Sequence, residues 1–178
     1  EAIRLWVDDY ATVFAARNPF GLLPYALYDA PPPEHPQHRY RPLGEGLCFR
    51  YFMANDGRIS NARCSLAAAA LAAAARVLAR PALMADAYRL LEWTLGANPF
   101  DRSFMTGFGT SQPEALSFQM GNIPGGVTLG PGGDEQDLPC CAHPRSCTDE
   151  YYGYQTSHFL WAVLALEALP WPVETERK

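Results

Sequence analysis

An alanine-rich segment over residues 60–78, SNARCSLAAAALAAAARVL, constrains the fold more than any other part of the chain. Alanine has the highest helix propensity, and its small side chain lets neighbouring helices approach closely. Ser60 or Asn61 can cap this helix at its start. Pro81 stands where a following helix would begin, and Gly96 is a suitable residue to end it. The two segments predict an antiparallel helical hairpin.

Two further helices are expected near the ends of the chain. Apolar side chains recur at helical spacing from Ala2 to Ala16, and the pattern stops at RNPFG. A last helix is expected from Tyr154 to Leu169, because Pro170 ends it. The residues of this last helix that we expect to be buried are Phe159, Leu160, Val163, Leu164 and Leu166.

The connections between these helices are long and rich in proline and glycine. In YDAPPPEHPQHRYRPLGEG the prolines remove backbone donors and fix φ, so neither a helix nor a central strand is expected. The connection over 97–148 far exceeds the usual roughly 12 to 15 residues of a structureless loop, and such loops commonly carry function. The sequence therefore predicts an all-α fold with long loops.

A short pattern occurs twice, as RNPFGLLPY and ANPFDRSFM, each time directly after an expected helix. Asn before Pro is held extended, and the proline cannot continue the helix. We interpret both segments as exit turns, and a true internal repeat is the alternative.

Composition excludes several classes of function. The formal net charge is −5 and the basic residues are scattered, whereas nucleic-acid binders cluster Lys and Arg to contact phosphates. No segment approaches the roughly 20 uninterrupted apolar residues of a membrane-spanning helix.

The 178 residues suit one globular domain. Because the chain begins with Glu1 and has no signal-peptide pattern, we expect it to be processed, trimmed or part of something longer.

Metal and thiol chemistry is left open by the sequence. Three of the five cysteines lie in CCAHPRSC, at Cys140, Cys141 and Cys147. This cluster is compatible with a disulfide, with free thiols, or with a zinc site that includes His143, although the paired CxxC spacing of structural zinc sites is missing. Cys147 with His143 could also act in nucleophilic catalysis. Asp134 and Glu135 could ligate calcium, although the alternating carboxylates of an EF-hand are missing.

Two glycine-rich segments, NPFDRSFMTGFG and GNIPGGVTLGPGGDE, allow the backbone to approach a ligand closely. Neither contains the GxGxxG or GK[ST] pattern of a nucleotide site, so a nucleotide is not expected. Arg102 in the first segment could bond sugar hydroxyls, or it could pair with its neighbour Asp101.

Acidic and aromatic residues meet in TDEYYGY, directly before the last helix. Capping and the helix dipole alone would explain Asp149 and Glu150 at that position. Alternatively, one of the two carboxyls is desolvated among Tyr151 and Tyr152, stays protonated and serves as a general acid. Aromatic faces of this kind also stack on sugar rings.

Several of these segments resemble family-9 glycoside hydrolases. WTLGANPFDRSFMTGFG is similar to a helix end of that family, IPGGV to its Pro-Gly-Gly loop, and DEYYGYQTSHFLWAVLAL to its closing segment. RYRPLGEGLCF and the alanine-rich helix resemble the preceding parts, so the resemblance covers most of the chain. The residues that match the helix-end motif are Leu95, Gly96, Asn98, Pro99, Ser103, Phe104, Gly107 and Gly109.

The resemblance implies a cellulase-like, inverting glycoside hydrolase that acts on β-linked poly- or oligosaccharides. Glu150 matches the position of the catalytic proton donor, and Arg102, Asp149, Tyr151 and Tyr152 would contact the substrate. It also implies a secreted or periplasmic protein of polysaccharide degradation that needs no cofactor, with calcium as the open alternative. Neither nucleic acid nor membrane is an expected partner.

The fold implied by the resemblance is an (α/α)6 toroid. Residues 1–178 have too few helices for the whole toroid and lack the family's water-activating aspartate, so we expect the C-terminal portion of one catalytic domain, with the missing N-terminal half as its partner. Such a portion would expose apolar faces. TSQPEALSFQMGN replaces the family's His-His-Arg, so a catalytically silent carbohydrate-binding or structural module of an extracellular assembly is the alternative. A polysaccharide lyase is disfavoured, because uronate substrates require a basic groove.

Overall fold

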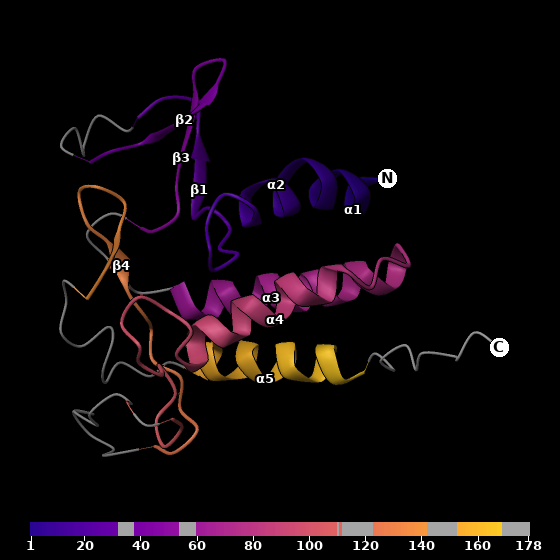
Figure 1. Ribbon diagram of the computed structural model, residues 1–178, viewed down its shortest axis with the longest axis vertical. Helices are drawn as coiled ribbons and strands as arrows, with labels where there is room; N and C mark the ends of the chain where they lie inside the picture. The colour runs from indigo at the N-terminus through magenta and orange to yellow at the C-terminus, as the bar shows by residue number, and fades with distance from the viewer. Residues whose placement is uncertain (32–37, 54–59, 110, 112–122, 142–152, 169–178) are drawn as a thin grey trace.

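The computed structural model places the helices side by side, with the sheets and loops gathered at one end of them (Figure 1). Within the residues that it describes, no helix is both long and apolar enough to cross a membrane. The described residues are 1–31, 38–53, 60–109, 111, 123–141 and 153–168.

The helices stand where the sequence predicts them. The N-terminal helix contains a π-helical turn, and the other helices follow the predicted boundaries to within a few residues. Gly96 ends the third of the predicted helices with φ at 129°, which glycine adopts without steric strain. The helical elements are α1 (Ala2–Leu5), the π-helical η1 (Trp6–Ala11), α2 (Thr12–Ala15), α3 (Ser60–Val77), α4 (Leu83–Leu95) and α5 (Gly153–Glu167).

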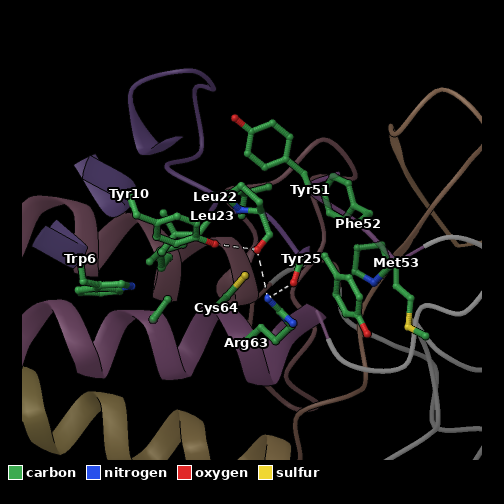
Figure 2. A pocket seen from close by; sticks show the side chains of 14 residues that line it. Trp6, Tyr10, Leu22, Leu23, Tyr25, Tyr51, Phe52, Met53, Arg63 and Cys64 are labelled. Carbon is green, nitrogen blue, oxygen red and sulfur yellow. Dashed lines mark hydrogen bonds between the residues drawn. The ribbon is translucent and has the colours of Figure 1, made fainter. Parts of the chain in front are cut away.

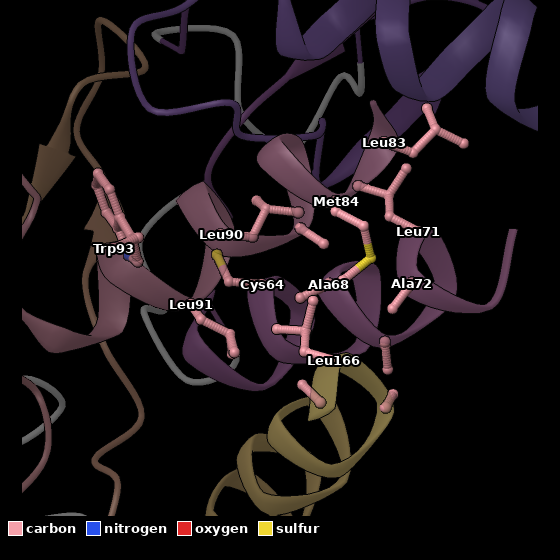
Figure 3. Close-up of a cluster of buried hydrophobic side chains, with 14 of the residues drawn as sticks. Cys64, Ala68, Leu71, Ala72, Leu83, Met84, Leu90, Leu91, Trp93 and Leu166 are labelled. Carbon is pink, nitrogen blue, oxygen red and sulfur yellow. The ribbon is translucent and has the colours of Figure 1, made fainter. Parts of the chain in front are cut away.

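The alanine-rich helix α3 is the centre of the packing. Ala68 and Ala72 have no exposed surface, and they belong to one buried cluster with Met84 of α4 and Leu166 of α5 (Figure 3). Because these alanine side chains are small, α4 and α5 both approach α3 closely. The predicted hairpin of α3 and α4 is confirmed, and α5 packs beside it on α3.

Only part of the apolar surface of α5 is buried. Phe159 and Leu166 are buried as expected, but Leu160 and Leu164 are more than half exposed, so their predicted burial is wrong. Trp161 is exposed to a similar extent, and the three exposed side chains share one side of the helix. This outer face of α5 agrees with the expectation that the chain leaves apolar surface uncovered.

The fold is mixed α/β, so the predicted all-α fold, a portion of an (α/α)6 toroid, is wrong. One antiparallel sheet has the strand order β1-β3-β2, and a second, smaller sheet pairs β4 with β5. Both lie beyond the same end of the helices (Figure 1). The strands are β1 (Ala26–Tyr28), β2 (Arg41–Gly44), β3 (Leu47–Arg50), β4 (Gly132–Gly133) and β5 (Pro139–Cys140).

The proline-rich connection contributes a strand, β2, because the proline within that strand, Pro42, lies where a sheet tolerates it. β2 is an edge strand, so Pro42 can lack an N–H without interrupting the middle of the sheet. The register shifts between Pro42 and Gly44. In the turn to β3, Glu45 and Gly46 both have positive φ, at 50° and 82°, as the type I′ hairpin turn requires. Proline is unfavourable in a central strand, but Pro42 is compatible with a hairpin at the edge of the sheet.

Asp137 ties the long connection after α4 to the first sheet. Its fully buried carboxylate accepts the backbone N–H groups of Tyr51 and Phe52, each at 3.1 Å. It also pairs with Arg41 at 2.7 Å and with Arg50 at 3.7 Å. The Arg50 side chain is only 1% exposed and also donates to backbone carbonyls. One carboxylate thus organises a region that the sequence alone presents as irregular.

Both Asn-Pro-Phe segments form the predicted exit turns. In each turn the Nδ2 of Asn18 or Asn98 donates to one carbonyl of the preceding helix and to one carbonyl four residues further on. The Oδ1 accepts the N–H two residues further on. Each asparagine therefore ties the end of the preceding helix to the turn that follows it. The Phe14 carbonyl also accepts the Arg17 N–H at 3.1 Å and the Tyr51 hydroxyl at 3.3 Å.

Candidate functional site

The two glycine-rich segments that the sequence singles out lie side by side. Met105 and Val127 form an isolated antiparallel bridge. Next to it, the Thr106 N–H donates to the Gly126 carbonyl at 2.9 Å, and the Gly125 N–H donates to the Thr106 carbonyl at 2.8 Å. The helix-end motif and the Pro-Gly-Gly loop are therefore one hydrogen-bonded unit.

The first turns of α3 and α5 anchor this unit. The Val127 N–H donates to Oγ1 of Thr156 in α5 at 3.0 Å. Asn61 in α3 donates its backbone N–H to the Leu129 carbonyl at 3.2 Å and its Nδ2 to the Thr128 carbonyl at 2.9 Å. Asn61 thus binds a distant loop with the side chain that could have capped its own helix. Four segments from across the sequence converge at the loop end of the helices.

The residues with an expected catalytic or sugar-stacking role directly precede α5 in the sequence. Asp149, Glu150, Tyr151 and Tyr152 lie outside the described residues. Gly153, which follows them directly, is the first residue of α5. The structure therefore describes the helix that follows these residues and the loops bonded to its first turn.

Arg102 is the one expected substrate-contact residue that the structure describes. It is half-buried, and its backbone carbonyl accepts a hydrogen bond from Nδ2 of Asn98 at 2.8 Å. Among the ion pairs within the described residues, none joins Arg102 to Asp101. Pairing with Asp101 is therefore not what holds the guanidinium, which leaves its N–H groups available for an acceptor on a ligand.

The calcium alternative gains no support from the glycine-rich loop. Oδ1 of Asp134 accepts the N–H groups of Gln136 and Leu138 at 2.8 and 2.9 Å, so this carboxylate shapes a tight turn. In the described part of the chain, no group of three or more His, Cys, Asp or Glu side chains could hold a metal ion.

The cysteines are in two different states. Cys141 is disulfide-bonded, whereas Cys48, Cys64 and Cys140 are free thiols. The disulfide removes one thiolate that a zinc site in CCAHPRSC would need. His143 and Cys147, which belong to the zinc and nucleophile alternatives, lie outside the described residues.

A cavity of about 220 Å³ lies where the N-terminal helix, α3 and α4 come together with the loops (Figure 2). Among the described residues that line it, Arg63 is the one charged side chain, and Cys64 is its neighbour in the lining. Sequence reasoning missed this cavity, because helical spacing assigns its helix-borne aromatic residues to packing. The aromatic residues of the lining are Trp6, Tyr10, Tyr25, Tyr51 and Phe52.

Alkylation of the free thiols tests the burial of Cys64, which lines the cavity. Burial raises the pKa of the Cys64 thiol to about 12. At about pH 8.5 almost no thiolate forms there, and the thiolate is the reactive species. Iodoacetamide should therefore alkylate the half-buried Cys140 well before Cys64 in the folded protein, and both at similar rates in urea, as followed by peptide mass spectrometry. Equal labelling of the two in the folded protein would contradict the described burial.

The backbone conformation of the convergent loops favours glycine at two positions. Gly107 and Gly125 both have positive φ, at 78° and 80°, so side chains are disfavoured at both positions.

No protein-family model, curated protein or solved structure matches the chain.

Proposed function

We propose that the chain is part of an inverting glycoside hydrolase that acts on β-linked poly- or oligosaccharides. The observation that carries the proposal is the bonding of the two glycine-rich loops to each other and to the first turn of α5. Glu150 precedes that helix by three residues in the sequence. Within the described residues, the helix-end motif, the Pro-Gly-Gly loop and α5, which all resemble parts of family-9 glycoside hydrolases, are thus neighbours in space.

In the proposed reaction Glu150 donates its proton to the glycosidic oxygen as the bond to the anomeric carbon breaks. A carboxylate supplied by polypeptide outside this chain takes a proton from water on the opposite face of the sugar, and the resulting oxygen bonds to the anomeric carbon. Inversion requires roughly 6.5–9.5 Å between the two carboxyl groups, so that the water fits. Arg102 and Asp149 would bond hydroxyls, and the neighbouring tyrosines would stack on sugar rings.

Two further features agree with this proposal. The exposed apolar face of α5 would be covered by the polypeptide that supplies the second carboxylate. A disulfide at Cys141 suits an oxidising compartment, which supports a secreted or periplasmic location.

The test is hydrolysis of β-glucan, chitin-type and xylan oligosaccharides by the full natural polypeptide that contains this chain. Proton NMR during the first turnovers should show the α-anomer as the initial product from at least one β-linked substrate. An initial β-anomer would contradict the inverting mechanism. Binding of oligosaccharides without cleavage would favour the silent module, and the absence of both would overturn a carbohydrate function.

A further inference from the structure

We propose that the cavity beside Arg63 is a ligand site for a single-ring aromatic carboxylate. This site is lined by residues of η1, α3, α4 and the loops around Pro24, Phe52 and Pro131. Arg102, the one residue with a proposed role in hydrolysis that the structure describes, is not among them. The site therefore goes beyond the proposed hydrolase function and does not depend on it.

The size of the cavity fits one ring and a small substituent. An apolar cavity of roughly 150 Å³ is sufficient to bind benzene. The volume here is about 220 Å³, and most of the lining is aromatic or aliphatic. Trp6 and Tyr10 lie on one side, as Figure 2 shows, with Tyr25 and Phe52 across from them. Aromatic side chains favour a ring through stacked and edge contacts.

The positive charge in the lining favours an anionic ligand. Arg63 contributes a positive charge, and no Asp or Glu is among the described residues that line the cavity. Its Nη2 donates to the carbonyls of Pro24 and Tyr25, and its guanidinium lies over the Tyr25 ring at 4.4 Å from the centroid. Within the described residues Nε and Nη1 have no hydrogen-bond acceptor. A carboxylate on the ligand would supply one, in a charge-assisted hydrogen bond.

The hydrogen-bonding groups of the lining disfavour a sugar in the same place. The hydroxyl of Tyr10 donates to the Pro24 carbonyl at 3.1 Å, and that of Tyr51 donates to the Phe14 carbonyl at 3.3 Å. A sugar ring would bring several hydroxyls into an apolar cavity with few partners left, and each unpaired hydroxyl costs binding free energy. An aromatic ring requires partners only for its carboxylate.

The N-terminal helix has unusual geometry where it contributes to the cavity. Trp6 and Tyr10 both belong to η1, the π-helical turn. Oγ1 of Thr12 donates to the Val7 carbonyl at 2.9 Å, which supports the widened turn. π-Helical turns are rare and are frequently retained at functional sites. This turn is an observation independent of the charge at Arg63, and both bear on the same cavity.

Calorimetric titration of the full natural polypeptide with benzoate tests the proposal. Benzoate should bind at least tenfold more tightly than benzyl alcohol, which lacks the charge, and than glucuronate, which lacks the aromatic ring. Arg63→Gln should weaken benzoate binding at least tenfold, while Arg76→Gln, an exposed arginine of the same helix, should leave it unchanged.

A second pair of variants avoids the backbone contacts of Arg63. Ala67→Leu, one helical turn along α3, should fill the cavity and abolish benzoate binding, and Ala70→Leu at an exposed position should not. Circular dichroism would verify that each variant is folded. The proposal is overturned if wild type does not bind benzoate, if glucuronate binds equally well, or if Ala67→Leu in a folded protein binds as wild type does. Because hydrolysis is not measured, failure here leaves the glycosidase proposal untouched.

Discussion

Replacing Glu150 with glutamine should lower kcat for β-linked oligosaccharides by about 10²–10⁴-fold and change KM little. Glutamine has nearly the same size and still forms hydrogen bonds, but it cannot transfer a proton to the leaving oxygen. The expected loss corresponds to about 3–5 kcal/mol of transition-state stabilisation. Initial-rate measurements on wild type and variant provide the comparison.

The structural alternative for Glu150, capping of the helix that follows, predicts a different pattern. Aryl glycosides with an acidic phenol as leaving group need little protonation, so Glu150→Gln should retain most of its activity on them. A variant slowed equally on both kinds of substrate would make Glu150 a structural residue. The matched control is Glu92→Gln, an exposed position on α4, which should behave as wild type on both.

The helices could be predicted because their signals are local. Alanine content and helical spacing identify α3 and α4, and the Asn-Pro turns and Gly96 set where helices end. The strands could not be predicted in the same way, because they are short and depend on partners distant in the sequence. β3 pairs with β1 on one side and β2 on the other, and Pro42 is acceptable only because β2 lies at the edge.

The candidate site was predictable to a similar extent. The glycine-rich loops could be recognised as functional candidates from composition, but their pairing through Met105 and Val127 is a tertiary contact. The cavity beside Arg63 is lined by residues from several elements, so no single segment of the sequence predicts it. Asp137 gave no sequence signal either, since an acid in a glycine-rich loop is ordinarily exposed.

Asp137→Ala should lower the free energy of unfolding by about 3–5 kcal/mol, as expected when one partner of a buried ion pair is removed. The variant leaves the guanidinium of Arg50, which is 1% exposed, without its carboxylate. It also deprives the N–H groups of Tyr51 and Phe52 of their acceptor. Urea-induced unfolding of wild type and variant measures the difference.

Two comparisons separate burial from other effects of this substitution. Asp8 and Arg80 form an ion pair in which both side chains are 42% exposed, so Asp8→Ala should cost only about 0–1 kcal/mol. Asp137 has φ at 62°, which asparagine tolerates better than alanine, so Asp137→Asn isolates the loss of charge from backbone strain. It should fall between the other two variants, because its amide oxygen can still accept an N–H. If Asp137→Ala costs no more than Asp8→Ala, the carboxylate does not hold the connection to the sheet.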